Sequence, residues 1–459
     1  MNRCQYASPA AFSFHEAIVQ RVILNYTCRN LFSSDNTPPR GIREGGIDMS
    51  GSFTPDEIKE LGKHRIAIFA DRVIINAQPP LSKERADEIE SFGSGPLPAD
   101  LRELWGLTAG GELCYDLNVR MGERIEPVGF SELFYDGSDG YHDLQGWIDH
   151  ELEIAEEASG DDDWNGTIFA IPFGGFEYGD RIYTVVEEGD DYGSVLAWKQ
   201  GFPPAWKGVL HEDSIGTVGS SVKDAFGRLC LEADPRNSNG EYNPGENFLE
   251  YVKEAVGNGL DSVLAEKLTS FYCEAVIDWK SELSDGSITS DENAARVALI
   301  HAAEGKDANL IINLSKVLPS IDIPCRGLLR PIEIALQKSN FSMCGVFIEC
   351  GSKVSADSLE YLNGPIPPSL LSIFIEKGAI PSIENAIICA ATGAAESADI
   401  IISSLSASDP SAPVKFGNAK TEAISKLKED LKKVKAGKLG HYLGESGLAE
   451  RIRNLETFR

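Results

Sequence analysis

The sequence predicts two structural classes in one chain: an α+β domain with a largely antiparallel sheet, followed by an all-α helical repeat domain. Of the 459 residues, 42% are apolar and 25% charged, which is enough for roughly two or three domains with hydrophobic cores. Short β-branched runs alternate with helical patterns up to about residue 230. Beyond residue 290, similar helical segments recur at a fixed spacing.

Changes in composition along the chain predict its domain organisation. The first residues have little periodicity, and Met49 stands just ahead of a capped helix as a possible alternative start. A polar break near residue 240 and another near residue 287 separate the later segments. We assign residues 1–48 to a poorly structured tail, 49–232 to an α+β domain and 233–246 to a linker. A helical connector (247–290), a repeat domain (291–410) and a Lys-rich helical cap or tail (411–459) follow.

The first elements are predicted from caps and β-branched runs. Thr54 fits a helix N-cap with Pro55 at the first helical position. Residues 65–76 are rich in β-branched side chains and are interrupted by an Ala-Asp pair, which predicts a strand pair. Residues 82–92 and 98–108 each carry apolar side chains at helical spacing, so two short helices follow.

A strand-rich half follows these helices. The Gly-Gly pair at 110–111 is expected to let the chain leave the preceding helix through positive φ. The pair at 174–175 is expected to do the same between two strands. The remaining predicted elements are strands at 112–118, 167–172, 180–187 and 194–199 and helices at 141–158 and 221–232. We expect structural roles for Leu97, Pro98, Leu101, Leu104, Gly110, Gly111, Gly174 and Gly175.

A helix and three runs of the α+β domain carry a family resemblance. They are the predicted helix at 83–92, LPADLRELWGLTAGG at 97–111, IPFGGFEYGDRIYTVV at 171–186 and GSVLAW at 193–198. In this order they resemble the SUKH superfamily, the Smi/Knr-like domain, over about a third of the chain. Two departures are a Gly-Gly in place of the family's usual Asn-Gly and a heavy acidic insert at 136–163. The resemblance implies a protein-binding domain, which in many bacterial members acts as a toxin immunity protein.

The C-terminal half contains a repeat. Ala302 to Asp307 and Ala335 to Asn340 align at a spacing of 33 residues, and each precedes an apolar helical run. This is the period of ankyrin repeats, and residues 330–355 resemble a degenerate ankyrin repeat. A generic array of helical hairpins is the alternative. Either array stacks its units around a continuous apolar seam and presents an interaction surface.

Acidic residues dominate the α+β domain. Between Ser131 and Tyr192 there are eighteen Asp and Glu residues and one basic residue, Arg181, so this acidic window contributes −17 to the net charge of −29. Such a balance argues against nucleic acid or an anionic membrane as partner. Nine scattered cysteines, no apolar run of membrane length and no signal-peptide pattern predict a cytoplasmic protein. The acids form either a solvated face or a binding surface for a basic partner.

Catalytic patterns are scarce in this sequence. It has no P-loop, no G-x-S-x-G, no H-E-x-x-H and no dinucleotide fingerprint. His142 and Asp143, with Asp149, His150 and Glu151, form the nearest approach to a metal cluster, but solvated side chains are the expected outcome. We therefore predict no enzyme, no cofactor, and no catalytic, cofactor-binding or metal-ligating residues.

Two functions are consistent with these features. The first is a protein-binding immunity protein that neutralises a basic, often nuclease-type, toxin; the alternative is a regulatory scaffold, as in cell-wall regulators with the same domain. Acidic rims around aromatic anchors favour association with basic proteins. The candidate partner-binding residues are Asp161, Asp162, Asp163, Trp164, Glu177, Tyr178, Asp180, Glu187, Glu188, Asp190, Asp191 and Tyr192.

Overall fold

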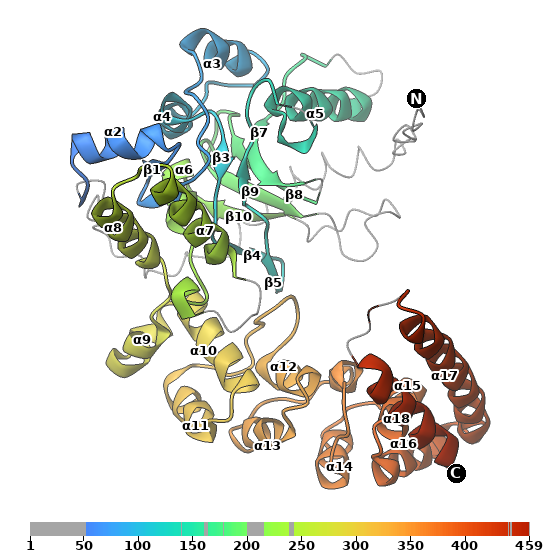
Figure 1. Cartoon of the computed structure of the whole chain (residues 1–459). Helices are drawn as coiled ribbons and strands as arrows, with labels where there is room; N and C mark the ends of the chain where they lie inside the picture. The colour runs from blue at the N-terminus through green and yellow to red at the C-terminus, as the bar shows by residue number, and fades with distance from the viewer. Residues whose placement is uncertain are drawn as a thin grey trace. The chain divides into compact units, whose positions relative to one another are not determined.

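The computed structural model divides the chain into two compact units, Met1–Ile277 and Asp278–Arg459 (Figure 1). The first unit combines helices with a mostly antiparallel sheet, and the named elements of the second are all helical. The predicted fold class is confirmed at this level of mixed helix and antiparallel sheet. The structure describes residues 52–138, 140–159, 164–177, 179–199, 215–237, 243–438, 440 and 443–458.

The chain of the first unit begins with a capped helix and a hairpin. Helix α2 (Pro55–Lys63) has Thr54 as N-cap with a complete capping box, as predicted. Strands β1 (Ala67–Phe69) and β2 (Arg72–Ile74) pair antiparallel, which confirms the predicted strand pair. Ala70 and Asp71 join them with φ of 45° and 59°, the backbone twist that tight hairpins require.

Two short helices lead into the sheet. Helix α3 (Lys83–Glu90) is capped by Ser82, whose side chain accepts from the Arg85 amide. Helix α4 (Ala99–Leu107) follows Pro98, which stands at the N-cap, one position before the helical turn predicted for it. The helices bury most of the apolar faces that the sequence predicts, Ala86 and Ile89 in α3 and Leu101, Leu104 and Trp105 in α4, but Leu107 is exposed.

The main sheet has six strands in the order β10-β9-β8-β7-β6-β3, and every neighbouring pair is antiparallel. A separate hairpin, β4 with β5, was not predicted. The strands are β3 (Gly111–Glu112), β4 (Asn118–Met121), β5 (Arg124–Pro127), β6 (Glu132–Leu133), β7 (Ala170–Phe176), β8 (Asp180–Val185), β9 (Val195–Lys199) and β10 (Ile215–Gly219).

The two Gly-Gly pairs differ from their predicted roles. Gly174 and Gly175 lie inside β7, not between strands. A Cβ at either position would meet neighbouring backbone, that of Glu132 or that of Asp180, so these glycines permit close strand packing. Helix α4 ends at Leu107, the C-cap Thr108 is already extended, and Gly111 belongs to β3.

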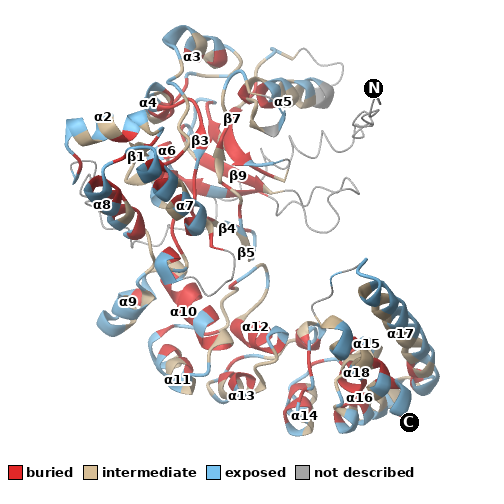
Figure 2. Cartoon of the chain, viewed as in Figure 1, coloured by how far each residue is buried: buried red, intermediate tan, exposed pale blue. Residues whose placement is uncertain are grey.

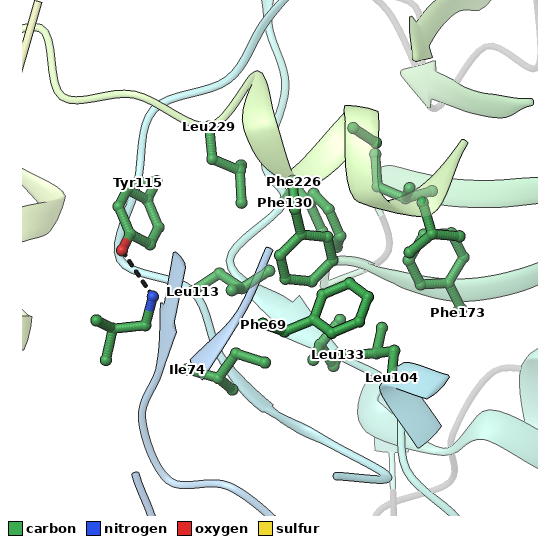
Figure 3. Packing of buried hydrophobic residues seen from close by; sticks show 14 of the residues in the cluster. Phe69, Ile74, Leu104, Leu113, Tyr115, Phe130, Leu133, Phe173, Phe226 and Leu229 are labelled. Carbon is green, nitrogen blue, oxygen red and sulfur yellow. Dashed lines mark hydrogen bonds between the residues drawn. The ribbon is translucent and has the colours of Figure 1, made fainter. Parts of the chain in front are cut away.

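The core of the first unit joins the sheet to the surrounding helices (Figure 2). Figure 3 shows Phe69, Phe130 and Phe226 packed together, and the Phe69 and Phe226 rings are 4.9 Å apart in an edge contact. Tyr115 is buried in the same core, and its hydroxyl oxygen accepts a hydrogen bond from the Val73 amide at 2.9 Å. The other elements of this unit are η2 (Gly140–His142), α5 (Leu144–Ser159), α6 (Val222–Gly227), η4 (Pro235–Asn237), α7 (Pro244–Gly257) and α8 (Ser262–Cys273).

Helices α7 and α8 belong to the core of the first unit. The rings of Phe248 and Tyr272 stack at 3.7 Å, and Tyr272 also contacts Tyr115 at 4.9 Å. The division between the units falls after Ile277. The helical connector assigned to 247–290 is therefore split between the two units.

The second unit is a stack of helical hairpins in two layers. Contacts of α10 with α12 and of α12 with η6 form one layer, and contacts of α11 with α13 and of α14 with α16 form the other. Helices α17 and α18 pack against α15. The elements are α9 (Trp279–Asp285), η5 (Ser287–Thr289), α10 (Glu292–Glu304), α11 (Ala308–Val317), α12 (Pro331–Gln337), α13 (Phe341–Glu349), η6 (Ser358–Tyr361), α14 (Pro368–Glu376), α15 (Ile383–Ala391), α16 (Ala395–Ser408), α17 (Ala412–Lys435) and α18 (Gly444–Thr457).

The 33-residue spacing has a local structural cause in this unit. Asp307 and Asn340, one period apart, are the N-caps of α11 and α13. The side-chain amide of Asn340 also donates to the Ala303 carbonyl at 2.8 Å, and this hydrogen bond joins the second hairpin to the first. In the next hairpin the first helix is reduced to the four-residue 3-10 turn η6, which precedes α14.

Candidate functional site

The structure separates the predicted partner-binding residues into two groups. Glu177 lies in the turn between β7 and β8, whereas Glu187, Glu188, Asp190, Asp191 and Tyr192 lie in the loop between β8 and β9. The six residues of β8 span about 20 Å, so the two groups stand at opposite ends of that strand. The residues Asp161, Asp162, Asp163 and Tyr178 lie outside the described residues.

Asp180 is one of the predicted partner-binding residues, but the structure buries it: it is only 8% exposed. Its Oδ2 atom accepts a hydrogen bond from the Gly129 amide at 2.6 Å and lies 3.9 Å from Nζ of Lys199. Burial raises the pKa of Asp180, while Lys199 and the Gly129 amide act in the opposite direction. Asp180 therefore fixes the loop before β6 and does not face a partner.

Trp164 is also partly withdrawn from the surface. Its indole Nε1 donates to the Thr167 carbonyl at 3.1 Å, within its own loop. The side chain of Asn165 accepts from the Thr167 amide at 3.1 Å and closes the same turn. Trp164 thus offers a partner no free N-H, although the sequence predicts an aromatic anchor there.

The loop between β8 and β9 is held at both ends by backbone hydrogen bonds. The amides of Val186 and Glu187 donate to the Phe169 carbonyl at 2.8 and 3.1 Å, and the Ser194 amide donates to the Asp191 carbonyl at 3.0 Å. Gly193 closes the loop with φ of 83°, a conformation that favours glycine. We call residues 187–192 the acidic loop.

The acidic loop concentrates negative charge without a counter-charge. Among the described residues, no Lys, Arg or His forms an ion pair with Glu187, Glu188, Asp190 or Asp191. Asp191 is partly buried, and burial together with the Asp190 carboxylate raises its pKa. Within the described part of the chain, no ion pair offsets the mutual repulsion of these four carboxylates, so the loop is a local concentration of negative charge.

Helices α3 and α4 extend this acidic surface. Tyr192 is 38% exposed, and partial burial followed by the charges of Glu90 and Asp100 raises its pKa. Arg102 neutralises part of this region, since it pairs with Glu90 at 2.7 Å and with Asp87 at 3.0 Å. Sequence reasoning missed Glu90 and Asp100, because nothing in the chain indicates that the α3–α4 region lies beside the acidic loop.

Arg181, the one basic residue of the acidic window, is buried. Its guanidinium lies 4.4 Å from the ring centres of both Trp147 and Trp198, and its Nε donates to the Tyr183 hydroxyl at 2.9 Å. That hydroxyl donates to Glu151 at 2.8 Å, and Glu151 also lies 3.7 Å from Arg181. Because the residue is only 6% exposed, the window presents no Lys or Arg at its surface.

Within the described part of the chain, no group of three or more His, Cys, Asp or Glu side chains is arranged to hold a metal ion. The residues weighed for such a cluster have other neighbours. His142 approaches Glu132, His150 contacts Trp147, and Glu151 accepts from Tyr183. None of the helices in the described ranges combines the length and apolar character needed to span a bilayer.

Comparison of the chain with protein-family models, with curated proteins and with solved structures found no match.

Proposed function

We propose that the chain is a non-enzymatic protein-binding module that neutralises a basic toxin, as an immunity protein with a SUKH-like domain and an ankyrin-like repeat domain. The acidic loop is the observation that carries this proposal. Its four carboxylates have no counter-charge among the described residues and stand on a hairpin anchored at both ends. A nuclease that grips phosphate is basic, so an acidic surface of fixed shape competes for the same cationic side chains.

The chemistry of the neighbouring residues also favours a binding role. Tyr192 supplies a half-exposed aromatic ring beside the acids, a residue type enriched at the energetic centres of interfaces. The buried position of Arg181 leaves the acidic window without a competing surface cation. The order of two short helices, an antiparallel sheet and a Gly-rich strand is in keeping with the SUKH-like expectation.

The proposal is tested by co-expressing the full chain with the product of the neighbouring gene. We expect protection of the host cell if that product is a toxin, and a complex whose formation slows at high salt. Absence of a toxic neighbour, together with capture of signalling proteins only, would reject the immunity function in favour of the regulatory scaffold.

The acidic loop itself is tested by charge removal. Replacing Glu187 and Glu188 with Gln and Asp190 and Asp191 with Asn is expected to slow association with the toxin by about tenfold at low salt, because steering is lost. The measurement is stopped-flow kinetics at several ionic strengths. A matched control removes the same charge from exposed positions on or next to α7 and α8, with Gln at Glu250, Glu254, Glu266 and Glu274.

The control variant should slow association by less than about threefold, since its charges lie away from the loop. Unfolding of both variants in urea shows whether the fold is retained. Equal slowing by the two variants would mean that only net charge matters and would remove the acidic loop from the binding surface.

A further inference from the structure

Glu132 is a carboxylate set into the main sheet at the edge that carries β3. On one side it stands directly opposite Glu112 of β3, and on the other side opposite Gly175 of β7. Its side chain is only 15% exposed. Like charges directly opposite each other destabilise an antiparallel pair, so this position needs a compensating interaction.

His142 makes a close polar contact with this carboxylate, although Oε2 of Glu132 has no hydrogen-bond partner among the described residues. Its Nδ1 atom lies 2.9 Å from Oε2 of Glu132. His142 belongs to η2, immediately before α5, and its carbonyl accepts from the Tyr135 amide at 2.9 Å. The Leu144 amide donates back to the Tyr135 carbonyl at 3.2 Å. The side-chain pair therefore joins β6 to the beginning of α5.

The groups around Glu132 make its charge state depend on pH near neutrality. Glu112 faces it from β3, Glu177 from the turn after β7 and His142 from η2. The side-chain amide of Asn76 donates to the Glu112 carboxylate at 2.8 Å and so holds that carboxylate in place. Burial, with added repulsion from Glu112 and Glu177, raises the pKa of Glu132 from 4.5 to about 7.

We propose that Glu132 keeps a proton at neutral pH and that this proton holds closed a pH-dependent latch between β6 and the start of α5. With the proton present, the carboxyl is neutral and is not repelled by Glu112 or Glu177. After the proton leaves, an anionic Glu132 faces Glu112 and Glu177 at this edge of the sheet. The latch acts on α5, which also carries the Trp147 and Glu151 side chains that enclose Arg181.

The direction of the pH dependence follows from the raised pKa. The folded protein binds this proton more tightly than the unfolded chain, so the stabilisation is complete below pH 4.5 and is lost as pH rises through about 7. Hydrogen exchange at the Leu144 and Trp147 amides of the full chain, corrected for intrinsic rates, measures the opening of α5. We expect protection to fall about tenfold between pH 6 and pH 8, which corresponds to one pKa unit of coupling.

Three variants separate the latch from a general structural role. Glu132→Gln should make protection independent of pH over this range, because the titrating carboxyl is gone. Glu112→Gln should keep the transition but move its midpoint to lower pH, since one repelling charge is removed. Glu153→Gln, at an exposed position of α5, should leave the profile unchanged.

The latch would be overturned if amide protection depended on pH in the same way in wild type and Glu132→Gln. It would also be overturned if the midpoint of that pH dependence were the same in wild type and Glu112→Gln. If Glu132→Gln does not fold, carbon NMR of the Glu132 carboxyl in the wild-type protein decides the question. A titration midpoint near 4.5, the ordinary pKa of a glutamate, would reject the proposal, and a midpoint near neutrality would support it.

Discussion

Replacing Arg181 with Met is expected to lower the free energy of unfolding of the first unit by about 3–5 kcal/mol. The change removes the cationic partner of Glu151, whose side chain is only 16% exposed, and leaves that carboxylate with the hydrogen bond from the Tyr183 hydroxyl but no counter-charge from Arg181. Two cation-π contacts and the hydrogen bond to Tyr183 are lost as well. Five of the six tryptophans belong to this unit, so urea unfolding followed by tryptophan fluorescence measures the loss.

The control for Arg181 is Arg236→Met. Arg236 also pairs with a carboxylate, Asp234 at 2.9 Å, but its side chain is 54% exposed. Its replacement should change the free energy of unfolding by less than about 1 kcal/mol, as exposed ion pairs do. Arg181→Lys should fall between the two, because a lysine keeps the charge but loses the planar group stacked between two indoles. Similar losses for the two Met variants would contradict the buried role of Arg181.

Replacing Glu333 with Gln is expected to lower the free energy of unfolding of the second unit by about 3 kcal/mol. Glu333 is 2% exposed, accepts from the Arg330 amide at 2.9 Å and forms an ion pair with the Arg330 guanidinium. Its Oε1 also accepts from the Ser358 hydroxyl at 3.1 Å, at the start of η6. The neutral amide removes the counter-charge that is hydrogen-bonded to the guanidinium, leaving the charges of Asp322 and Asp357, and its NH2 group would face other hydrogen-bond donors.

Glu304→Gln is the matched control for Glu333. Glu304 pairs with two cations, Arg326 at 3.2 Å and Lys338 at 3.5 Å, yet it lies nearer the surface. The expected loss is below about 1 kcal/mol. Far-UV circular dichroism during urea unfolding follows the helices of both units, and tryptophan fluorescence, which comes mainly from the first unit, identifies the transition that belongs to the second. If Glu333→Gln is no more destabilising than Glu304→Gln, the buried carboxylate is not a structural centre of the array.

Local features of the fold were predictable from the sequence because their causes are local. Thr54 and Ser82 cap helices through hydrogen bonds to residues three positions away, and the Ala-Asp pair at 70–71 marks its own turn. The β4–β5 hairpin was missed. Its buried Val119, Met121 and Ile125 alternate with charged residues over strands of only four positions, too short for a clear pattern.

The candidate site was predictable only in part. Glu187, Glu188, Asp190 and Asp191 were predicted as partner-binding residues, and the structure exposes the first three in the loop between β8 and β9, whereas Asp191 is partly buried. The burial of Asp180 and Arg181 follows from the pairing of β8 with β9 and from the position of α5. Those contacts join residues far apart in the chain, so no local pattern reveals them.

The anchored acidic loop also sets a relation between folding and binding. The four acids are near neighbours in the sequence, and the backbone bonds at both ends of the loop fix its conformation in the folded chain. Under the proposed binding function, a cationic surface would relieve the repulsion among these carboxylates. That partner would meet a loop that is already ordered, so little conformational entropy would be lost on association. Folding therefore supplies in advance part of the ordering that the proposed complex requires.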